Sequence, residues 1–381
     1  MRMNTTATRE SGFGTRDSGL PPSPYGLPAG FGGPGGRREA GGERRSCRAT
    51  AHIVRLVAMT ALILSAAAPG TIGQTADIAG RPGPLAHTFS IVARDPATGE
   101  MGVAVQSHWF SVGALGAWAE AGVGAVATQP FVDPAYGHKG LELMRTGAPA
   151  PEALKRLRAA DAQREVRQVA MIDARGRVDA FTGKLDIADA GHHVGAQFSV
   201  QANMMANAKV WPAMAAAFEK TPGDLAGRLL AALEAAQAAG GDIRGKQSAA
   251  ILVVKATSSG RPWAGADRVF DLRVDDHPEP IAELKRLIRL QRAYTHANRG
   301  DELVAEKKID EALKEYTAAG ELAPEILELP FWQAVTLVVV GREAEAAPIF
   351  RRVFAKEPWW ADLVPRLPAA GQLPVDPALI A

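Results

Sequence analysis

Two short apolar segments, 88–95 and 101–107, place apolar residues with a period of two and flank the turn sequence PATGE. Such alternation is typical of strands, and Pro96 and Gly99 supply the turn between them. Further segments follow in the order strand, helix pair, strand pair, helix pair, strand pair, without the regular strand–helix alternation of a doubly wound sheet. This order favours an α+β fold in which two antiparallel sheets lie between helical layers.

Charge and cysteine content exclude several classes of function. The 381 residues include 43 basic and 41 acidic ones, interspersed apart from an arginine-rich beginning, so no nucleic-acid surface is indicated. Cys47 is the only cysteine, which excludes an internal disulfide and a cysteine metal cluster. The histidines His108, His138 and His192–His193 form no metal-ligand pattern, because no acidic or cysteine partner stands at a ligand spacing. We expect no metal and no other cofactor.

The first part of the chain resembles a targeting region. Residues 1–50 are rich in Gly, Pro, Arg and Ser, which predicts a disordered low-complexity segment; a start further downstream, for example at Met59, is an alternative. Residues 51–86 combine a basic flank, about twelve mostly apolar residues and a stretch of small residues, as in a signal peptide with its linker. The run is shorter than the roughly twenty residues of a membrane span. We expect export to the periplasm or the exterior, with a short N-terminal anchor as the alternative.

Five longer segments resemble a known family: HTFSIVARDPATGEMGVAVQS, AGVGAVATQ, FSVQANMM, GGDIRGKQSAAILVV and DLRVDDHPEPIAELKRL. In this order they are similar to the domain of unknown function 1028, which is grouped with the N-terminal nucleophile (Ntn) hydrolases. The similarity covers roughly 88–290. It implies a four-layer αββα sandwich, which we assign to residues 87–277, and cleavage of amide bonds by a Thr, Ser or Cys at the first position of the mature chain. It names no substrate.

Thr88 is the nucleophile candidate, because it opens the first strand of this region. If the His87–Thr88 bond were cut, the new α-amine, with an ordinary pKa near 8, could take the hydroxyl proton. No signal-peptidase signature stands at this bond, and the more natural cuts lie ten to twenty residues earlier. Either the chain processes itself or Thr88 is an ordinary strand residue. Ser90, on the same strand face, is a second nucleophile candidate that would need a different base.

Three side-chain amides at segment ends, Gln129, Gln201 and Asn203, are candidates for stabilising a developing oxyanion. An amide can donate to such an oxygen while remaining neutral, and we assign Gln129 and Asn203 to catalysis and Gln201 to substrate binding. The alternative is that the same amides cap turns.

Four further residues are candidates for binding substrate. Arg94 could orient the amine or a substrate carboxylate, and Ser107 ends the second strand beside the opening of the sheet. Lys246 and Gln247 open the strand KQSAAILVV, where Lys246 could lower the pKa of a neighbouring amine or bind a carboxylate. Lys246 could equally be a solvated residue at a strand edge.

Residues 278–381 are expected to form a helical region that begins with a long amphipathic helix over 281–298. Similar residues then recur after thirty-four positions, at Leu303 and Leu337, Ala312 and Ala346, Tyr316 and Phe350, and Pro324 and Pro358. This spacing resembles the tetratricopeptide repeat, although two repeats are fewer than the three usually needed. The first helix could therefore cap the repeats. A docking surface for a protein partner and a stabilising appendage are both open, and a homodimer is compatible with the sequence.

Two hypotheses of function follow. The leading one is an exported Ntn-type hydrolase of a small amide or peptide-like substrate, with Thr88 as the nucleophile after processing. The alternative is a catalytically silent αββα domain that binds a small ligand or a cell-envelope partner, with the repeat tail as a protein-interaction region.

Overall fold

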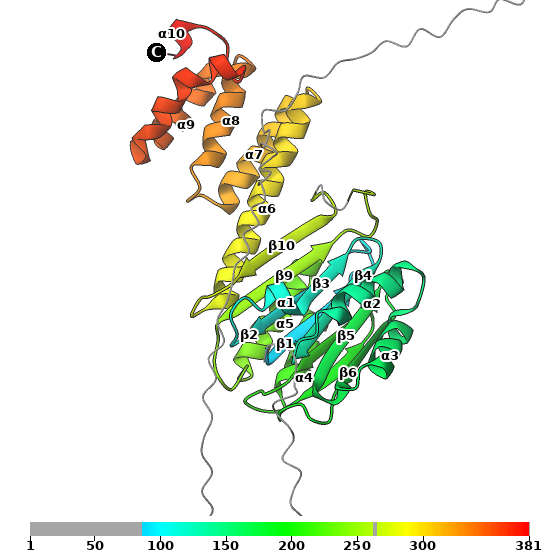
Figure 1. Ribbon diagram of the computed structural model, residues 1–381. Coiled ribbons are helices and arrows are strands. Elements are labelled where there is room, and N and C mark those ends of the chain that lie inside the picture. The colour runs from blue at the N-terminus through cyan, green and yellow to red at the C-terminus, as the bar shows by residue number, and fades with distance from the viewer. Residues whose placement is uncertain (1–85, 262–264, 381) are drawn as a thin grey trace, which may run out of the picture. The chain divides into compact units, whose positions relative to one another are not determined.

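A computed structural model describes residues 86–261 and 265–380 (Figure 1). The expected low-complexity segment 1–50, and 51–86 except for its last residue, lie outside the described residues. Within the described part, ten strands form two antiparallel sheets, and several helices follow them near the C-terminus. The predicted α+β class with two antiparallel sheets is therefore confirmed.

The larger sheet has six strands in the order β10-β9-β2-β1-β8-β7. Its strands are β1 Thr88–Arg94, β2 Met101–Ser107, β7 Gly191–Gly195, β8 Phe198–Ala202, β9 Ser248–Val254 and β10 Arg268–Val274. The pairing register sets Thr88 opposite Ser107, and Ser107 opposite Ser248. Hydroxyl side chains of three neighbouring strands thus meet at one end of this sheet.

The smaller sheet has four strands in the order β3-β4-β5-β6. They are β3 Ala117–Glu120, β4 Gly124–Pro130, β5 Arg167–Asp173 and β6 Val178–Thr182, with the short helix α1 Gly113–Gly116 before β3 and the 3-10 turn η2 Arg164–Val166 before β5. The order expected from the sequence omitted β3 and the β7–β8 hairpin. β3 has four half-buried residues, and β7 has a largely exposed sequence, GHHVG, so neither presents an apolar alternation.

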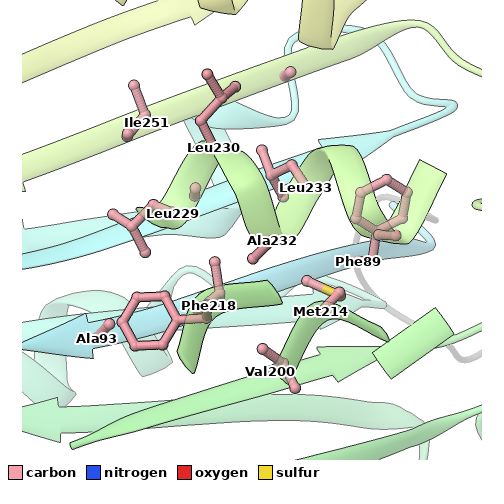
Figure 2. Packing of buried hydrophobic residues seen from close by; sticks show 14 of the residues in the cluster. Phe89, Ala93, Val200, Met214, Phe218, Leu229, Leu230, Ala232, Leu233 and Ile251 are labelled. Carbon is pink, nitrogen blue, oxygen red and sulfur yellow. The ribbon is translucent and has the colours of Figure 1, made fainter. Parts of the chain in front are cut away.

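Two helices, α4 Val210–Lys220 and α5 Leu225–Ala238, cover one face of the six-stranded sheet. Alternate residues of β1 face them, because successive side chains of a strand point to opposite sides. Phe89 and Ala93 belong to this core together with Met214 and Phe218 of α4, as Figure 2 shows. The remaining residues of β1 consequently face the other sheet.

The four-stranded sheet is covered on its outer face by α2 Ala135–Arg145 and α3 Ala150–Ala160, which pack on Val126 and Met171. Its inner face meets the six-stranded sheet through a core of mostly small side chains, namely Val92, Val103, Ala125, Ala127, Ala170, Ile172 and Ala180. The elements from β1 to β10 therefore form four layers, with helices outside and the two sheets inside.

The long helix α6 Pro280–Ala305 extends beyond the expected 281–298 and begins in the core of α4 and α5 through Ile281 and Leu284. Helical segments follow, and as far as Ala370 each packs on the one before it. They are α7 Ile309–Leu322, α8 Glu328–Val339, α9 Glu343–Lys356, the 3-10 segments η4 Pro358–Arg366 and η5 Pro368–Ala370, and α10 Pro377–Ile380. Among the helices of the described residues, a span of membrane-crossing length and apolar character is not found.

We expect Phe331→Ala to destabilise the C-terminal helices. Phe331 is 0% exposed and its ring lies 4.7 to 5.7 Å from the rings of Trp332, Phe350 and Trp360. Truncation of such a residue costs about 3–5 kcal/mol of unfolding free energy, measurable by urea denaturation followed by tryptophan fluorescence. Trp359→Ala is the control, because Trp359 is 63% exposed. Equal effects of both substitutions would contradict this packing.

Candidate functional site

A buried polar cluster lies between the two sheets, at the end of β1 where Thr88 stands. Residues of four strands and of the turn after β8 share two properties: they face the space between the sheets, and they are at most 1% exposed. We call this the inter-sheet polar cluster, and it contains Thr88, Ser90, Gln129, Gln168, Ser199, Gln201 and Asn203. Because unpaired buried polar groups are costly, the hydrogen bonds of these side chains decide whether the two sheets can meet here.

Gln168 sets the direction of the hydrogen bonds. Its Nε2 donates to the backbone carbonyls of Ala202 and Gly191, at 2.9 and 3.2 Å. Carbonyls can only accept, so the nitrogen of this amide is identified, and Oε1 must be the acceptor. Oε1 receives Nδ2 of Asn203 at 2.9 Å and Nε2 of Gln129 at 2.8 Å. The orientation of three buried amides therefore follows from two backbone carbonyls.

Ser90 links Gln129 to Gln201 within the inter-sheet polar cluster. Gln129 Nε2 also donates to the Thr88 carbonyl at 3.1 Å, so both of its amide hydrogens are used. Ser90 Oγ donates to Gln129 Oε1 at 2.8 Å and accepts from Gln201 Nε2 at 2.7 Å. Gln201 Oε1 in turn accepts from Ser199 Oγ at 3.1 Å. The Ser90 proton is thus directed at an amide oxygen, which is not a base.

His87 joins this cluster through Asn203. Its Nδ1 lies 3.0 Å from Asn203 Oδ1, which can only accept, so Nδ1 carries the proton. Burial lowers the pKa of His87, and the hydrogen bond to Asn203 opposes this only in part. The ring is therefore neutral at neutral pH. Its Nε2 is buried and has no hydrogen-bond partner among the described residues.

The carbonyl oxygen of His87, which belongs to the peptide bond preceding Thr88, accepts two hydrogen bonds. Ser107 Oγ donates at 2.5 Å and Arg244 Nη2 at 2.8 Å. Asp242 holds the guanidinium through contacts of 2.7 and 3.0 Å, and its own side chain is 0% exposed. A hydroxyl and a positively charged donor are thus directed at one carbonyl oxygen, which is how proteins polarise a carbonyl for attack.

The Thr88 hydroxyl belongs to the residue that follows this carbonyl. Thr88 Oγ1 donates its proton to the carbonyl oxygen of Ala86 at 2.6 Å, and the Thr88 side chain is fully buried. The two preceding residues are buried as well, because Ala86 is 0% and His87 2% exposed. In the uncut chain, the hydroxyl is therefore close to the preceding peptide bond and shielded from other molecules.

The structure brings six of the nine predicted site residues together: Thr88, Ser90, Ser107, Gln129, Gln201 and Asn203. The side chains of the other three do not join these residues, although the Gln247 backbone amide donates to the Ser107 carbonyl at 3.1 Å. Arg94 ends β1 about 20 Å from Thr88 and donates to Gln197 at 2.7 Å. Lys246 is paired with Glu279, and Gln247 donates to Asp276 at 3.1 Å. The amides expected to serve an oxyanion bond mainly to one another, and the His87 carbonyl is held by other groups.

Sequence reasoning missed His87, Gln168, Asp242 and Arg244. Gln168 was detectable in principle, because it has the same phase in its strand as the inward-facing Ala170. Arg244 was not, since its position depends on the turn after α5, where Gly240 and Gly241 adopt positive φ angles of 125° and 62°. These backbone angles help to direct residue 244 toward the end of β1.

Asp186 is a second unusual group near this end of β8. Both carboxyl oxygens are buried without a hydrogen-bond partner among the described residues. Its loop is joined to the turn after β8 by the Met204 amide, which donates to the Ile187 carbonyl at 2.9 Å. Burial raises the pKa of Asp186 from 3.8 to about 7. The backbone of Gly183 lowers this pKa, and the negative charge of Glu165 raises it. Among the described residues, no group of three or more His, Cys, Asp or Glu side chains is arranged to hold a metal ion.

This shift predicts that Asp186 destabilises the fold as the pH rises. The folded state holds a proton that the unfolded state, with its lower pKa, has released, so the stability present near pH 4 is lost through pH 7. We expect Asp186→Asn to raise the unfolding free energy at pH 8 by about 1–3 kcal/mol and to leave it nearly unchanged at pH 4. The measurement is urea denaturation at both pH values, with the exposed Asp362→Asn as control. A gain that does not depend on pH would contradict the assignment.

Comparison with known proteins identifies the family. A family model described as a family of unknown function, DUF1028, matches residues 88–284, which is just over half of the chain. The crystal structure of a Silicibacter pomeroyi protein described as a member of DUF1028 is 32% identical, covers 53% of this chain and 88% of its own, and has a TM-score of 0.48. No curated protein matches the chain. The chain therefore belongs to the family of unknown function DUF1028.

Proposed function

We propose that the protein is an Ntn-type hydrolase of a small amide or peptide-like substrate, with Thr88 as its nucleophile after cleavage of the His87–Thr88 bond. One observation carries the proposal. The carbonyl of that bond accepts hydrogen bonds from Ser107 and Arg244, while the hydroxyl of the following residue, Thr88, is fully buried and donates to the Ala86 carbonyl. Strand pairing alone does not explain why the charged Arg244 donates to the His87 carbonyl.

Self-cleavage follows from this arrangement in two steps. The Thr88 oxygen adds to the His87 carbonyl carbon, and negative charge develops on the oxygen bound by Arg244 and Ser107. The C–N bond breaks, the nitrogen takes the hydroxyl proton, and an ester joins His87 to the Thr88 side chain. Water then hydrolyses the ester, which leaves a carboxyl group on His87 and a free amine and hydroxyl on Thr88.

The same groups would act on an external amide. The α-amine of Thr88, with an ordinary pKa near 8, takes the hydroxyl proton as the oxygen attacks, and passes it to the leaving amine. The acyl group remains on Thr88 until water releases it. Arg244 and Ser107 are then free to hold the substrate carbonyl, and the inter-sheet polar cluster keeps the Thr88 backbone in place through Gln129.

The fold and the family match support the Ntn assignment. The four layers, with two antiparallel sheets between helices, are those that such a sandwich requires, and the matched region begins at Thr88. Export is part of the proposal through the signal-like segment 51–86. The helical region is proposed as tetratricopeptide-like, since Leu303 and Leu337 are each 3% exposed, and Ala312 and Ala346 are 0% and 1% exposed.

The alternative is a binding protein without catalysis, and a cavity in the C-terminal helices favours it. The cavity has a volume of about 530 Å³ and is lined by side chains that include Asp301, Tyr316 and Trp332. Its size suits a small ligand or a side chain of a protein partner, and the same helical region could join two copies of the chain. This alternative predicts a stable chain in which the His87–Thr88 bond is never cut.

Substitution of the proposed nucleophile gives the first test. We expect Thr88→Ala to abolish self-cleavage and to reduce amide hydrolysis by at least about 10³-fold, because the variant lacks the attacking oxygen of the proposed mechanism. Thr88→Ser should keep both reactions. The assay is release of a fluorescent amine from aminoacyl substrates. Ser90→Ala distinguishes the two hydroxyls, and loss of hydrolysis in this variant alone would assign the reaction to Ser90.

Substitution of Arg244 gives the second test. Loss of one donor to a developing oxyanion costs about 10²–10³-fold in rate, so Arg244→Ala should slow self-cleavage by that factor, measured by gel electrophoresis of the freshly translated chain. Arg244→Lys should restore part of the rate, since it keeps the charge. Arg273→Ala is the control, because Arg273 is an exposed residue of β10. An unchanged rate in Arg244→Ala would remove Arg244 from the reaction.

A further inference from the structure

The two residues in front of Thr88 occupy the place that the acyl part of a substrate would take. This inference rests on the proposed function, because self-cleavage and substrate hydrolysis share one nucleophile and one carbonyl position. The carbonyl of His87 is held by Ser107 and Arg244, and its side chain and that of Ala86 are buried. The groups that contact Ala86 and His87 are therefore the groups that we expect to contact the acyl part of a substrate.

The His87 side chain lies in a site with one polar and one aromatic contact. Its ring meets the ring of Phe131 edge-on, with a centroid distance of 6.1 Å and an angle of 74°. Its Nδ1 donates to Asn203 Oδ1 at 3.0 Å. Asn203 cannot turn its nitrogen to this place without losing its bond to Gln168 Oε1. The site thus offers a fixed hydrogen-bond acceptor beside an aromatic ring.

The Ala86 side chain lies in an apolar surrounding. It shares a buried core with Val105, Val112, Val132 and Ala250, while its carbonyl oxygen accepts the Thr88 hydroxyl at 2.6 Å. Ala86 is 0% exposed, so a larger side chain would displace these neighbours. A small residue is therefore required before the residue that donates its acyl group.

We propose that the mature enzyme hydrolyses amides of short peptides in which a small apolar residue precedes a planar residue with a hydrogen-bond donor, as in Ala-His. The planar side chain occupies the site of His87 and donates to Asn203 Oδ1. The carbonyl that follows it is held by Arg244 and Ser107 and is attacked by Thr88. One water is consumed, and the products are the peptide acid and the free amine.

Three fluorogenic peptides test this substrate class on the self-cleaved full chain at pH 8. They are acetyl-Ala-His, acetyl-Ala-Phe and acetyl-Ala-(Nπ-methyl-His), each as the 7-amido-4-methylcoumarin. At this pH the imidazole is neutral, and about half of the α-amine is unprotonated. Methylation at Nπ, the Nδ1 position, replaces the donated proton by a methyl group, whereas the Phe peptide lacks the donor without this added group. We expect kcat/KM for Ala-His to exceed both others by about tenfold, the worth of one buried hydrogen bond.

An independent measurement uses the chain itself. His87→Phe keeps a ring of similar size but loses the donor, so self-cleavage should slow by about tenfold, whereas the same change at the exposed His193, His193→Phe, should leave the rate within about twofold. Equal kcat/KM for the three peptides, or hydrolysis of none of them by a chain that has released Thr88, overturns the substrate class and leaves the nucleophile intact. A chain that never releases Thr88 overturns the proposed function as well.

Discussion

Two hydrogen bonds from the Gln168 side chain to the backbone carbonyls of Gly191 and Ala202 determine the organisation of the whole site. They fix which end of that amide donates, and this choice passes to Asn203 and then to the ring of His87. Polar side chains between two sheets are tolerated only when they are paired, since an unpaired buried group costs about 1–3 kcal/mol. The hydrogen bonds that fix the orientations of these side chains also offset the cost of burying them.

The position of Arg244 depends on a different element, the turn that ends α5. Gly240 and Gly241 adopt positive φ angles there, which most other residues rarely do, and the chain then bends so that Asp242 pairs with Met205 in a short bridge. The side chain of Asp242 is fully buried and is paired with the guanidinium of Arg244. A helix end far from β1 in sequence thus supplies the charge at the His87 carbonyl.

The fold class was predictable because its signal is local. Alternating segments such as 88–94, and helical segments such as 225–238, are long enough to show their period, whereas β3 and β7 are too short or too exposed to do so. Within the site, Thr88, Gln129 and Asn203 could be found as polar residues at segment ends. Their partners could not, because pairing across two sheets depends on register and turn geometry. The sequence indicated Lys246, because it opens the strand KQSAAILVV, but its side chain binds Glu279, and the site's cation is Arg244, two residues earlier.

We propose above that the chain cuts its own His87–Thr88 bond, whose carbonyl is held by Ser107 and Arg244. Intact-mass spectrometry of the protein purified after expression of the full sequence tests this most directly. The account predicts a dominant species with the mass of residues 88–381, and conversion of any longer species to it on incubation without added protease. A homogeneous chain that retains Ala86 and His87, and that stays so during incubation, would contradict the account.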